Sequence, residues 1–449
     1  MFSAIGRIFR TPDLRRKLGF TLLIVALFRL GSQIPAPFVD YKNIQLCLAS
    51  NSGTGGLYDL INLFSGGALL SLSVFALGIM PYITASIIVQ LLRVVIPHFE
   101  SLYQEGQSGQ SRLTQYTRYL TIGLGIIQST TLITVARSGN LFQNSGVAEC
   151  GQLITDQSWY AMLLMIITMT AGTGLIMWLG ELITERGIGN GMSLLIFTSI
   201  CASFPTSLWS IAVSNANPDG SPNWELFLLV IAIGVVIMGA VVFVEQSQRR
   251  IPVQYAKRMV GRRTYGGNNT YIPIKVNMGG VVPVIFASSL LYLPALIAQF
   301  NQPKPGEQTA GWVTWIQNNL TSGDSWVYML VFFLLIIGFT YFYVAITFNP
   351  EEVADNMKKY GGFIPGIRAG RPTAEYLDYV LTRITLPGSV YLGIISLIPL
   401  FAFSLIGGGA NSRFPFGGTS LLIIVGVGLE TVKQIDSQLQ QRHYEGLLR

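Results

Sequence analysis

Apolar runs long enough to cross a lipid bilayer recur along the whole chain, and they constrain its fold more than any other feature. A membrane-spanning helix needs about 20 mostly apolar residues. Ten runs meet or approach that length, at 18–36, 73–92, 116–136, 159–180, 192–213, 225–244, 278–299, 326–348, 384–405 and 418–433. Half of the 449 residues are hydrophobic and 11% are charged, whereas soluble domains are about 25% charged. We therefore predict an all-α polytopic membrane protein with ten transmembrane helices.

The positive charges divide unevenly between the two sides of this predicted bundle. Lys and Arg accumulate in the cytoplasmic loops of membrane proteins. The loops after spans two, four, six and eight, together with both terminal segments, hold 24 of the 29 Lys and Arg residues. The opposite side holds 4, and Arg29 falls inside the first span, where we expect backbone carbonyls or a polar neighbour to hold it for a structural purpose. Both termini are therefore predicted to be cytoplasmic.

The second span differs from a plain membrane helix. The segment before it, at about 60–71, is short, apolar and amphipathic, with Gly66 and Gly67 in its middle, and Pro81 interrupts the span that follows. Twelve residues are too few to cross a bilayer, which needs about 20. Broken backbone at membrane depth is tolerated only where protein buries it or where it lines a watery cavity. We therefore expect a cavity or pore beside this stretch.

A nine-residue segment of the second span recurs in the seventh. Gly78–Ser86 reads GIMPYITAS and Gly280–Ser288 reads GVVPVIFAS, with Gly, Pro, Ile, Ala and Ser at the same offsets. Chance is one explanation, since Gly and Pro are frequent in membrane helices. We favour an internal repeat whose halves meet at the functional site. Five spans per half force the halves to enter the membrane in opposite senses, so we predict an inverted repeat of residues 1–213 and 214–449.

Two long cytoplasmic loops of the second half, at about 245–275 and 349–383, mix basic with apolar residues. In the first loop, 266–269 (GGNN) is interpreted as a turn between two short β-prone runs. Positive charge alone would keep both loops inside the cell. It would not explain the apolar groups among the charges, which are Tyr255, Tyr265, Tyr271, Phe363 and Ile364. We interpret the loops as a docking surface for a large, partly anionic partner, such as ribosomal RNA or an acidic protein face.

Signatures of enzyme chemistry are missing from the sequence. It has no phosphate-loop motif, no H-E-x-x-H and no paired-cysteine metal spacing. We expect no catalytic residue, no metal and no cofactor. The glycine-rich 187–191 is interpreted as a tight turn between spans four and five. Cys47 and Cys150 fall in loops predicted to lie outside, either as a disulfide or as two thiols, and the sequence does not decide between these.

Three functions are compatible with this layout. A secondary transporter would carry ionisable residues at mid-membrane, and the spans have almost none. A scaffold that only docks ribosomes would leave 60–71 and the broken second span unexplained. A protein-conducting channel needs a narrow apolar lining, and two aliphatic pairs four residues apart, Ile79 with Ile83 and Met192 with Ile196, would suit it. Plain packing or a lipid-facing position is the more usual explanation of this spacing.

Longer motifs make the chain resemble the SecY family, the channel subunits of the bacterial Sec protein translocase. Besides the segment at 78–86, they are FSGGA at 64–68, QYTRY at 115–119, TERGIGNG at 184–191, KVNM at 275–278, FIPGIR at 363–368 and FGGTS at 416–420. The resemblance covers essentially the whole chain. It implies an hourglass pore between two five-helix halves, which opens sideways between spans two and seven.

The resemblance also assigns roles to individual residues. It implies a plug made of Leu60, Ile61, Asn62, Leu63, Phe64, Ser65, Gly66, Gly67, Ala68, Leu69, Leu70 and Ser71. It implies a constriction ring of Ile79, Ile83, Met192, Ile196, Ile285 and Ile423. Lateral-gate positions are Pro81, Thr84, Gln90, Gln128 and Pro283, and partner-docking positions are Arg249, Arg250 and Arg368. Family members often have Ile where Met192 stands, so the flexible Met is expected to keep a looser seal.

The implied function is a channel and not an enzyme. It would translocate unfolded secretory polypeptides across the cytoplasmic membrane of a bacterium and release hydrophobic segments laterally into it. Because the chain has no nucleotide site, energy would come from a SecA-like motor ATPase or from the ribosome. Further implied partners are SecE-like and SecG-like membrane subunits and the secretory and membrane-protein substrates. The net charge of +7 makes anionic lipids a further expected partner.

Overall fold

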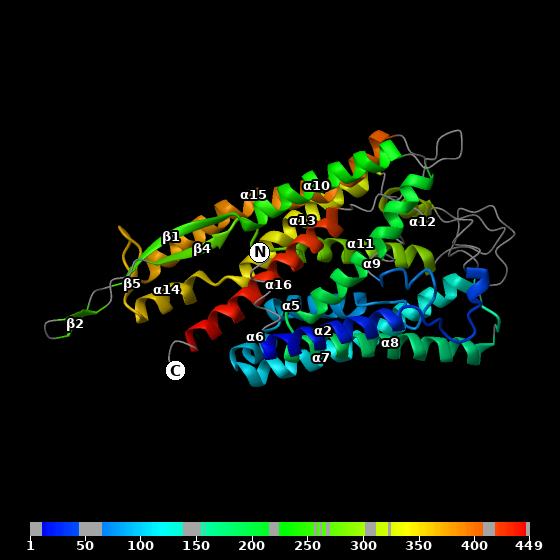
Figure 1. Cartoon of the computed structure of the whole chain (residues 1–449), viewed down its shortest axis with the longest axis horizontal. Helices are drawn as coiled ribbons and strands as arrows, with labels where there is room; N and C mark the ends of the chain where they lie inside the picture. Colours follow the sequence, from blue (N-terminus) through cyan, green and yellow to red (C-terminus); the bar gives the residue numbers. More distant parts are fainter. Residues whose placement is uncertain are drawn as a thin grey trace.

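The computed structural model is an elongated helical bundle with a small sheet at one end (Figure 1). It describes residues 11–44, 65–137, 154–156, 158–214, 224–255, 258–260, 263–265, 270–300, 311–321, 325–406 and 418–445. A helix lies at each of the ten predicted spans. The predicted helical fold is therefore confirmed.

The helices of the N-terminal half form one packed group. They are α2 (Pro12–Gly31), α5 (Met80–Val95), α6 (Pro97–Gln104), α7 (Gln107–Arg137), α8 (Trp159–Arg186) and α9 (Gly191–Ser214). Helices α5 and α7, α7 and α8, and α8 and α9 lie in contact, and α2 contacts α8 and α9. The chain bends by 100° between α5 and α6, where Pro97 begins the second helix and removes one backbone donor.

The helices of the C-terminal half form a second group. They are α10 (Trp224–Gln246), α11 (Val282–Phe300), α12 (Gly311–Ile316), α13 (Trp326–Thr347), α14 (Pro350–Lys359), α15 (Arg371–Ile406) and α16 (Gly418–Glu445), with a π-helical turn at Gln317–Thr321. Helix α13 packs against α11 and α15. Helix α16 contacts α9 of the first group and α10 and α15 of its own.

Five strands lie in the described part of the chain: β1 (Gln248–Tyr255), β2 (Arg258–Val260), β3 (Arg263–Tyr265), β4 (Thr270–Lys275) and β5 (Gly362–Phe363). Strand β1 lies between β4 and β5, so the two predicted cytoplasmic loops share one sheet. The predicted β-prone runs are confirmed. Strand β2 pairs with β3 in a separate two-stranded sheet. The turn predicted at 266–269 stays a prediction. Residues 266–269 lie outside the described residues and connect β3 to β4.

Several predicted span boundaries were wrong. Helix α5 begins at Met80 and not at 73, and α11 begins at Val282 and not at 278. Pro81 therefore lies in the first turn of α5, where proline is favoured, and does not interrupt the helix. Helix α15 begins before the predicted run at 384–405, and α16 ends after the predicted run at 418–433. The apolar runs did not report these ends, because the added helical turns contain charged and polar residues.

Length and composition support membrane crossing for part of this set. Among the described residues, five helices are long and apolar enough to cross a bilayer, and the bent α5–α6 pair would make a sixth. The five are Gln107–Arg137, Trp159–Arg186, Phe227–Gln246, Trp326–Lys359 and Arg371–Ile398. The ten-span count stays a prediction.

The polar elements gather at one end of the molecule. The β1–β4 hairpin and α14 lie at the left-hand end in Figure 1, where α2 also begins and α16 ends. The buried side of this body is an apolar cluster that includes Ile251, Val253, Ile274, Met357 and Leu377. The two long loops thus fold as one structured protrusion.

Candidate functional site

The helices α5 and α11 begin in the same way. Gly78 has φ +55° and Gly280 has φ +58°, and each helix starts two residues later. Glycine adopts this left-handed conformation without steric penalty. Proline occupies the second helical position in both, as Pro81 and Pro283.

The repeat extends to the backbone hydrogen bonds around these starts. The Ile83 N–H donates to the Ile79 carbonyl over 3.1 Å, and the Ile285 N–H donates to the Val281 carbonyl over 3.3 Å. Both residues of the second bond lie 202 positions after those of the first. By the same offset, Val281 is the counterpart of the ring residue Ile79.

A second set of equivalent contacts precedes each start. The Val74 N–H donates over 2.9 Å to the backbone carbonyl of Ile34, a residue that follows α2. In the same way, the Val276 N–H donates over 3.1 Å to the backbone carbonyl of Ser247, which follows α10. A Cβ at Gly172 of α8 would overlap the Val74 carbonyl, and one at Gly388 of α15 would overlap the Val276 carbonyl. Helices α8 and α15 occupy spans four and nine, the corresponding places of the two halves. These contacts support an internal repeat.

The six predicted constriction-ring residues lie in one apolar cluster, although they come from α9, α11, α16, α5 and the residue before α5. Ile79, Ile196 and Ile423 are 3%, 4% and 1% exposed. The other three, Ile83, Met192 and Ile285, are partly buried against the same cluster. The cluster also takes in Val281, which sequence reasoning missed and which the 202-residue offset could have found.

The turn before the ring residues of α9 is held tightly. Helix α8 ends at Arg186 and α9 begins at Gly191, so the predicted tight turn is confirmed. The Gly191 N–H donates to the Thr184 hydroxyl over 2.9 Å, and a Cβ at Gly191 would overlap the Gly180 carbonyl. The Asn190 side chain accepts from the Met192 N–H over 3.1 Å and so caps the helix.

Part of the predicted plug lies among the described residues. Ser65–Ser71 forms turns with little regular helix, and Leu60, Ile61, Asn62, Leu63 and Phe64 lie outside the described residues. Leu69 and Leu70 pack in an apolar cluster with residues of α7 and α8. The Arg29 guanidinium donates to the Gly66 carbonyl over 2.7 Å. This confirms the expectation that a backbone carbonyl holds Arg29.

The predicted lateral-gate residues lie on helices that meet. Helix α11 contacts both α5 and α7. Pro81, Pro283 and Gln128 are buried there, whereas Gln90 is exposed. The Thr84 hydroxyl donates within its own helix, to the Met80 carbonyl over 3.0 Å. The Ser288 hydroxyl likewise stays within α11.

The predicted docking arginines are all exposed, on the sheet and on the loop that follows β5. Arg249 and Arg250 lie on β1, and the Arg250 guanidinium lies 4.7 Å from the centre of the Tyr271 ring. Arg368 lies in the turn between β5 and α15.

The aromatic and aliphatic residues of these loops divide between surface and interior. Tyr255, Tyr271 and Phe363 are exposed, which is compatible with docking. Ile364 is 4% exposed and packs in the interior of the protrusion, so its assignment to a docking surface was wrong. The Tyr265 side chain lies outside what the structure describes.

A polar contact at the start of α11 was missed from the sequence. Asn277 is buried, and its side-chain amide donates to Glu245 Oε1 over 2.6 Å and to the Gly280 carbonyl over 3.2 Å. It thereby joins the end of α10 to the left-handed glycine that precedes α11. The KVNM motif contains Asn277, but its partner is 32 residues away in sequence and no local pattern identifies it.

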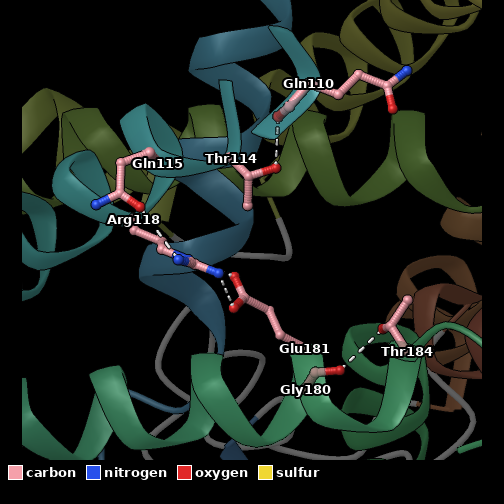
Figure 2. Close-up of polar contacts among 7 residues, drawn as sticks. All are labelled: Gln110, Thr114, Gln115, Arg118, Gly180, Glu181 and Thr184. Carbon is pink, nitrogen blue, oxygen red and sulfur yellow. Dashed lines mark hydrogen bonds and ion pairs between the residues drawn. The ribbon is translucent and has the colours of Figure 1, made fainter. Parts of the chain in front are cut away.

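A bidentate ion pair joins α7 to α8 (Figure 2). Arg118 donates to Glu181 through Nη2 over 2.6 Å and through Nε over 3.0 Å. A hollow of about 350 Å³ opens beside it, also lined by Met177, Trp178, Leu182 and Glu185. The pair braces the N-terminal half. Across the described ranges, no group of three or more His, Cys, Asp and Glu residues is placed to hold a metal ion.

Comparison with known proteins places these features in context. The sequence model of the SecY family matches residues 73–432. Protein translocase subunit SecY of Streptomyces coelicolor is 64% identical to this chain, and that of Micrococcus luteus is 58% identical, each over the full length of both proteins. The counterpart from Mycobacterium tuberculosis is 56% identical, again over the full length of both.

Solved structures share the fold at low sequence identity. One, described as a protein-conducting channel, has a TM-score of 0.63 and 18% identity, and the match covers 93% of this chain and 91% of the other. A second, Sec61 in the canine ribosome–channel complex from the endoplasmic reticulum, has a TM-score of 0.59 and 17% identity over the same shares.

Proposed function

The chain belongs to the SecY family of protein translocase subunits, and from that premise we propose how it conducts polypeptides across a membrane. It is a multi-pass membrane protein and a channel subunit, not an enzyme. Unfolded secretory chains pass through the constriction ring, which lies between an N-terminal half at 1–213 and an inverted C-terminal half at 214–449.

One observation carries the proposal. Six apolar side chains from α9, α11, α16, α5 and the residue before α5 gather in a single apolar cluster beside the two glycine–proline helix starts. A narrow apolar constriction excludes ions because water leaves it. It also lacks fixed polar partners, so it can accept varied polypeptide sequences. Helices of both halves contribute to the cluster, so a relative movement of the halves would widen it.

The lateral gate is the contact of α11 with α5 and α7. The Thr84 and Ser288 hydroxyls bond within their own helices, which leaves mainly apolar surface to separate. A hydrophobic segment of a substrate could replace that surface at little free-energy cost, because one apolar contact substitutes for another. Gln90, Gln128, Pro81 and Pro283 belong to the same gate.

The protrusion built from β1, β4, β5 and α14 docks the source of energy. Its exposed Arg249, Arg250 and Arg368 suit an anionic partner. We assign to it a SecA-like motor ATPase and the ribosome. SecE-like and SecG-like subunits and anionic lipids complete the assembly, in the cytoplasmic membrane of a bacterium with both termini in the cytoplasm.

Site-specific photocrosslinking tests this function. A photoreactive residue is placed at Ile83, at Ile423 or at the control position Ile394 of α15, whose side chain is 50% exposed on the outside of the bundle. A secretory chain is then stalled midway through translocation. We expect crosslinks to the substrate from Ile83 and Ile423 and none from Ile394.

Two results would reject the proposal. Absence of crosslinks at both ring positions, with the substrate shown to be engaged on the cytoplasmic face, would mean that polypeptide does not pass through the ring. Equal crosslinking at all three positions would mean that the substrate passes along the lipid-facing surface.

A further inference from the structure

Arg29 is a charged residue in the interior of a predicted membrane span. A charge at that depth is costly and is usually retained for function. Its guanidinium is only partly buried, and Nη1 donates to the Gly66 carbonyl over 2.7 Å. Its helical neighbour Phe28 is buried in the same apolar cluster as the constriction ring.

Gly66 allows this approach because it has no side chain. Its φ is +68°, and a Cβ there would lie 2.9 Å from Arg29 Nη1 and 3.3 Å from Ser199 Cα. The backbone of 65–71 is thus held between α2 on one side and α9 on the other.

The contact lies close to the constriction ring. Ser199 follows the ring residue Ile196 by three positions on α9, which is about 4.5 Å along the helix axis. On its other side, the segment buries Leu69 and Leu70 against α7 and α8. Arg29 thus fixes the glycine end of 65–71 beside the ring, while the leucines fix the remainder.

We propose that Arg29 is a positioning residue that latches 65–71 in place through the Gly66 carbonyl, so that the resting channel stays closed to ions. The inference rests on the proposed channel function and adds a specific holder for the closed state. When a substrate enters the ring, the segment leaves its place and this hydrogen bond breaks. Loss of the latch therefore opens the resting channel without impairing the transport of substrate.

The test uses the full chain, purified with its accompanying membrane subunits and reconstituted in phosphatidylethanolamine–phosphatidylglycerol vesicles. Potassium leak without substrate and translocation of a secretory precursor are both measured for each variant. Arg29→Met removes the donor, and Arg29→Lys keeps a charged donor. We expect Arg29→Met to raise the resting leak about tenfold, as loss of a charge-assisted hydrogen bond would. Arg29→Lys should restore most of the seal, and precursor translocation should persist in both.

Gly66→Ala and Gly67→Ala form a matched pair. Both glycines have left-handed backbones, with φ +68° and +90°, so both substitutions strain the segment. Only at Gly66 would the new Cβ meet Arg29, since nothing lies within 4 Å of a Cβ at Gly67. We expect Gly66→Ala to leak like Arg29→Met, and Gly67→Ala to leak clearly less. The Arg29→Met, Gly66→Ala double variant should leak no more than either single variant.

The outcomes separate the latch from the channel. A resting leak of Arg29→Met equal to that of the wild type, or equal leaks of the two glycine variants, would overturn the latch. Loss of translocation together with a low leak in Arg29→Met would assign Arg29 a purely structural role and also overturn it. Failure of the wild-type chain to translocate any precursor would instead reject the proposed function.

Discussion

The starts of α5 and α11 are nearly the same, but the segments that lead into them differ. Before α5, the described part of the predicted plug, 65–71, buries Leu69 and Leu70 in an apolar cluster with residues of α7 and α8. Before α11, the chain passes from α10 through the β1–β4 hairpin and enters from the protruding sheet. The plug and the hairpin thus occupy corresponding places in the repeat. In the proposed channel, one half would link its gate helix to the plug, and the other would link its gate helix to the docking surface.

The residue three positions before each left-handed glycine marks the difference. In the N-terminal half this residue is Phe75, whose ring stacks on Phe28 with the centroids 6.0 Å apart. In the C-terminal half it is Asn277, which hydrogen-bonds Glu245. Apolar packing fixes one start, and a polar contact to the helix that carries the hairpin fixes the other.

Phe75→Ala should have the largest effect. Phe75 is buried and its ring occupies the space beside Gly31. Truncating a buried Phe typically costs about 3–5 kcal/mol of the free energy of unfolding. Titration with a denaturing detergent should show this loss, and Phe75→Leu should lose less. Equal stability of Phe75→Ala and the wild type would show that packing does not fix this start.

Asn277→Ala should have the next largest effect. It removes the donor to Glu245, which leaves a half-buried carboxylate without that partner at a cost of about 1.5–3 kcal/mol. The matched control is Glu245→Gln, because an amide oxygen can still accept from Asn277. The same titration should rank wild type, Glu245→Gln and Asn277→Ala in decreasing order of stability. A reversed order of the two variants would contradict the assigned contact.

Gly172→Ala and Gly388→Ala test whether the halves are equivalent. Each added methyl would overlap a backbone carbonyl, of Val74 or of Val276, and overpacking of this kind costs about 1–3 kcal/mol. Gly174→Ala on α8 is the control, since a Cβ there meets nothing within 4 Å. Both test variants should lower the midpoint of thermal unfolding by similar amounts. A large drop in the unfolding midpoint for one of the two variants and none for the other would argue against equivalent packing in the two halves.

Arg118→Lys should have the smallest effect. The Arg118 side chain is 40% exposed and that of Glu181 is 17% exposed, so solvent screens the pair. Replacing the bidentate guanidinium with an ammonium should cost about 1 kcal/mol or less. Arg118→Met should cost more, because it leaves Glu181 unpaired. The midpoint of thermal unfolding should therefore decrease from the wild type to Arg118→Lys to Arg118→Met. A lower midpoint for Arg118→Lys than for Arg118→Met would contradict the role assigned to the ion pair.

Much of the fold could be predicted from apolar runs and one short repeat. The Gly78–Ser86 and Gly280–Ser288 segments identified the two equivalent helix starts, since glycine and proline constrain the backbone directly. Helix ends could not be predicted as well. The long extension of α15 before 384 mixes charged residues with apolar ones such as Leu377, and it packs on α14, which hydropathy does not report.

The candidate site was less accessible to sequence reasoning. Spacing alone did not distinguish Ile79 and Ile83 from ordinary core residues, and the family resemblance was needed to select them. Ile364 was misassigned because Lys359 and Arg368 flank its segment, whereas it packs in a cluster with apolar residues of β1, β4 and α15. Asn277 was missed because its contact depends on how α10 and β4 are brought together.

Distance measurements between spin labels test the central claim most directly, namely that two halves of one repeat separate between α5 and α11. Labels at Val94 and Leu290 report on the gate, and both side chains are exposed. Control pairs lie within each half, Val94 with Ile126 and Leu290 with Leu334, also at exposed positions. When a secretory chain is stalled in the channel, the gate distance should lengthen while both control distances stay constant. An unchanged gate distance with substrate engaged, or equal changes in all three pairs, would contradict the account.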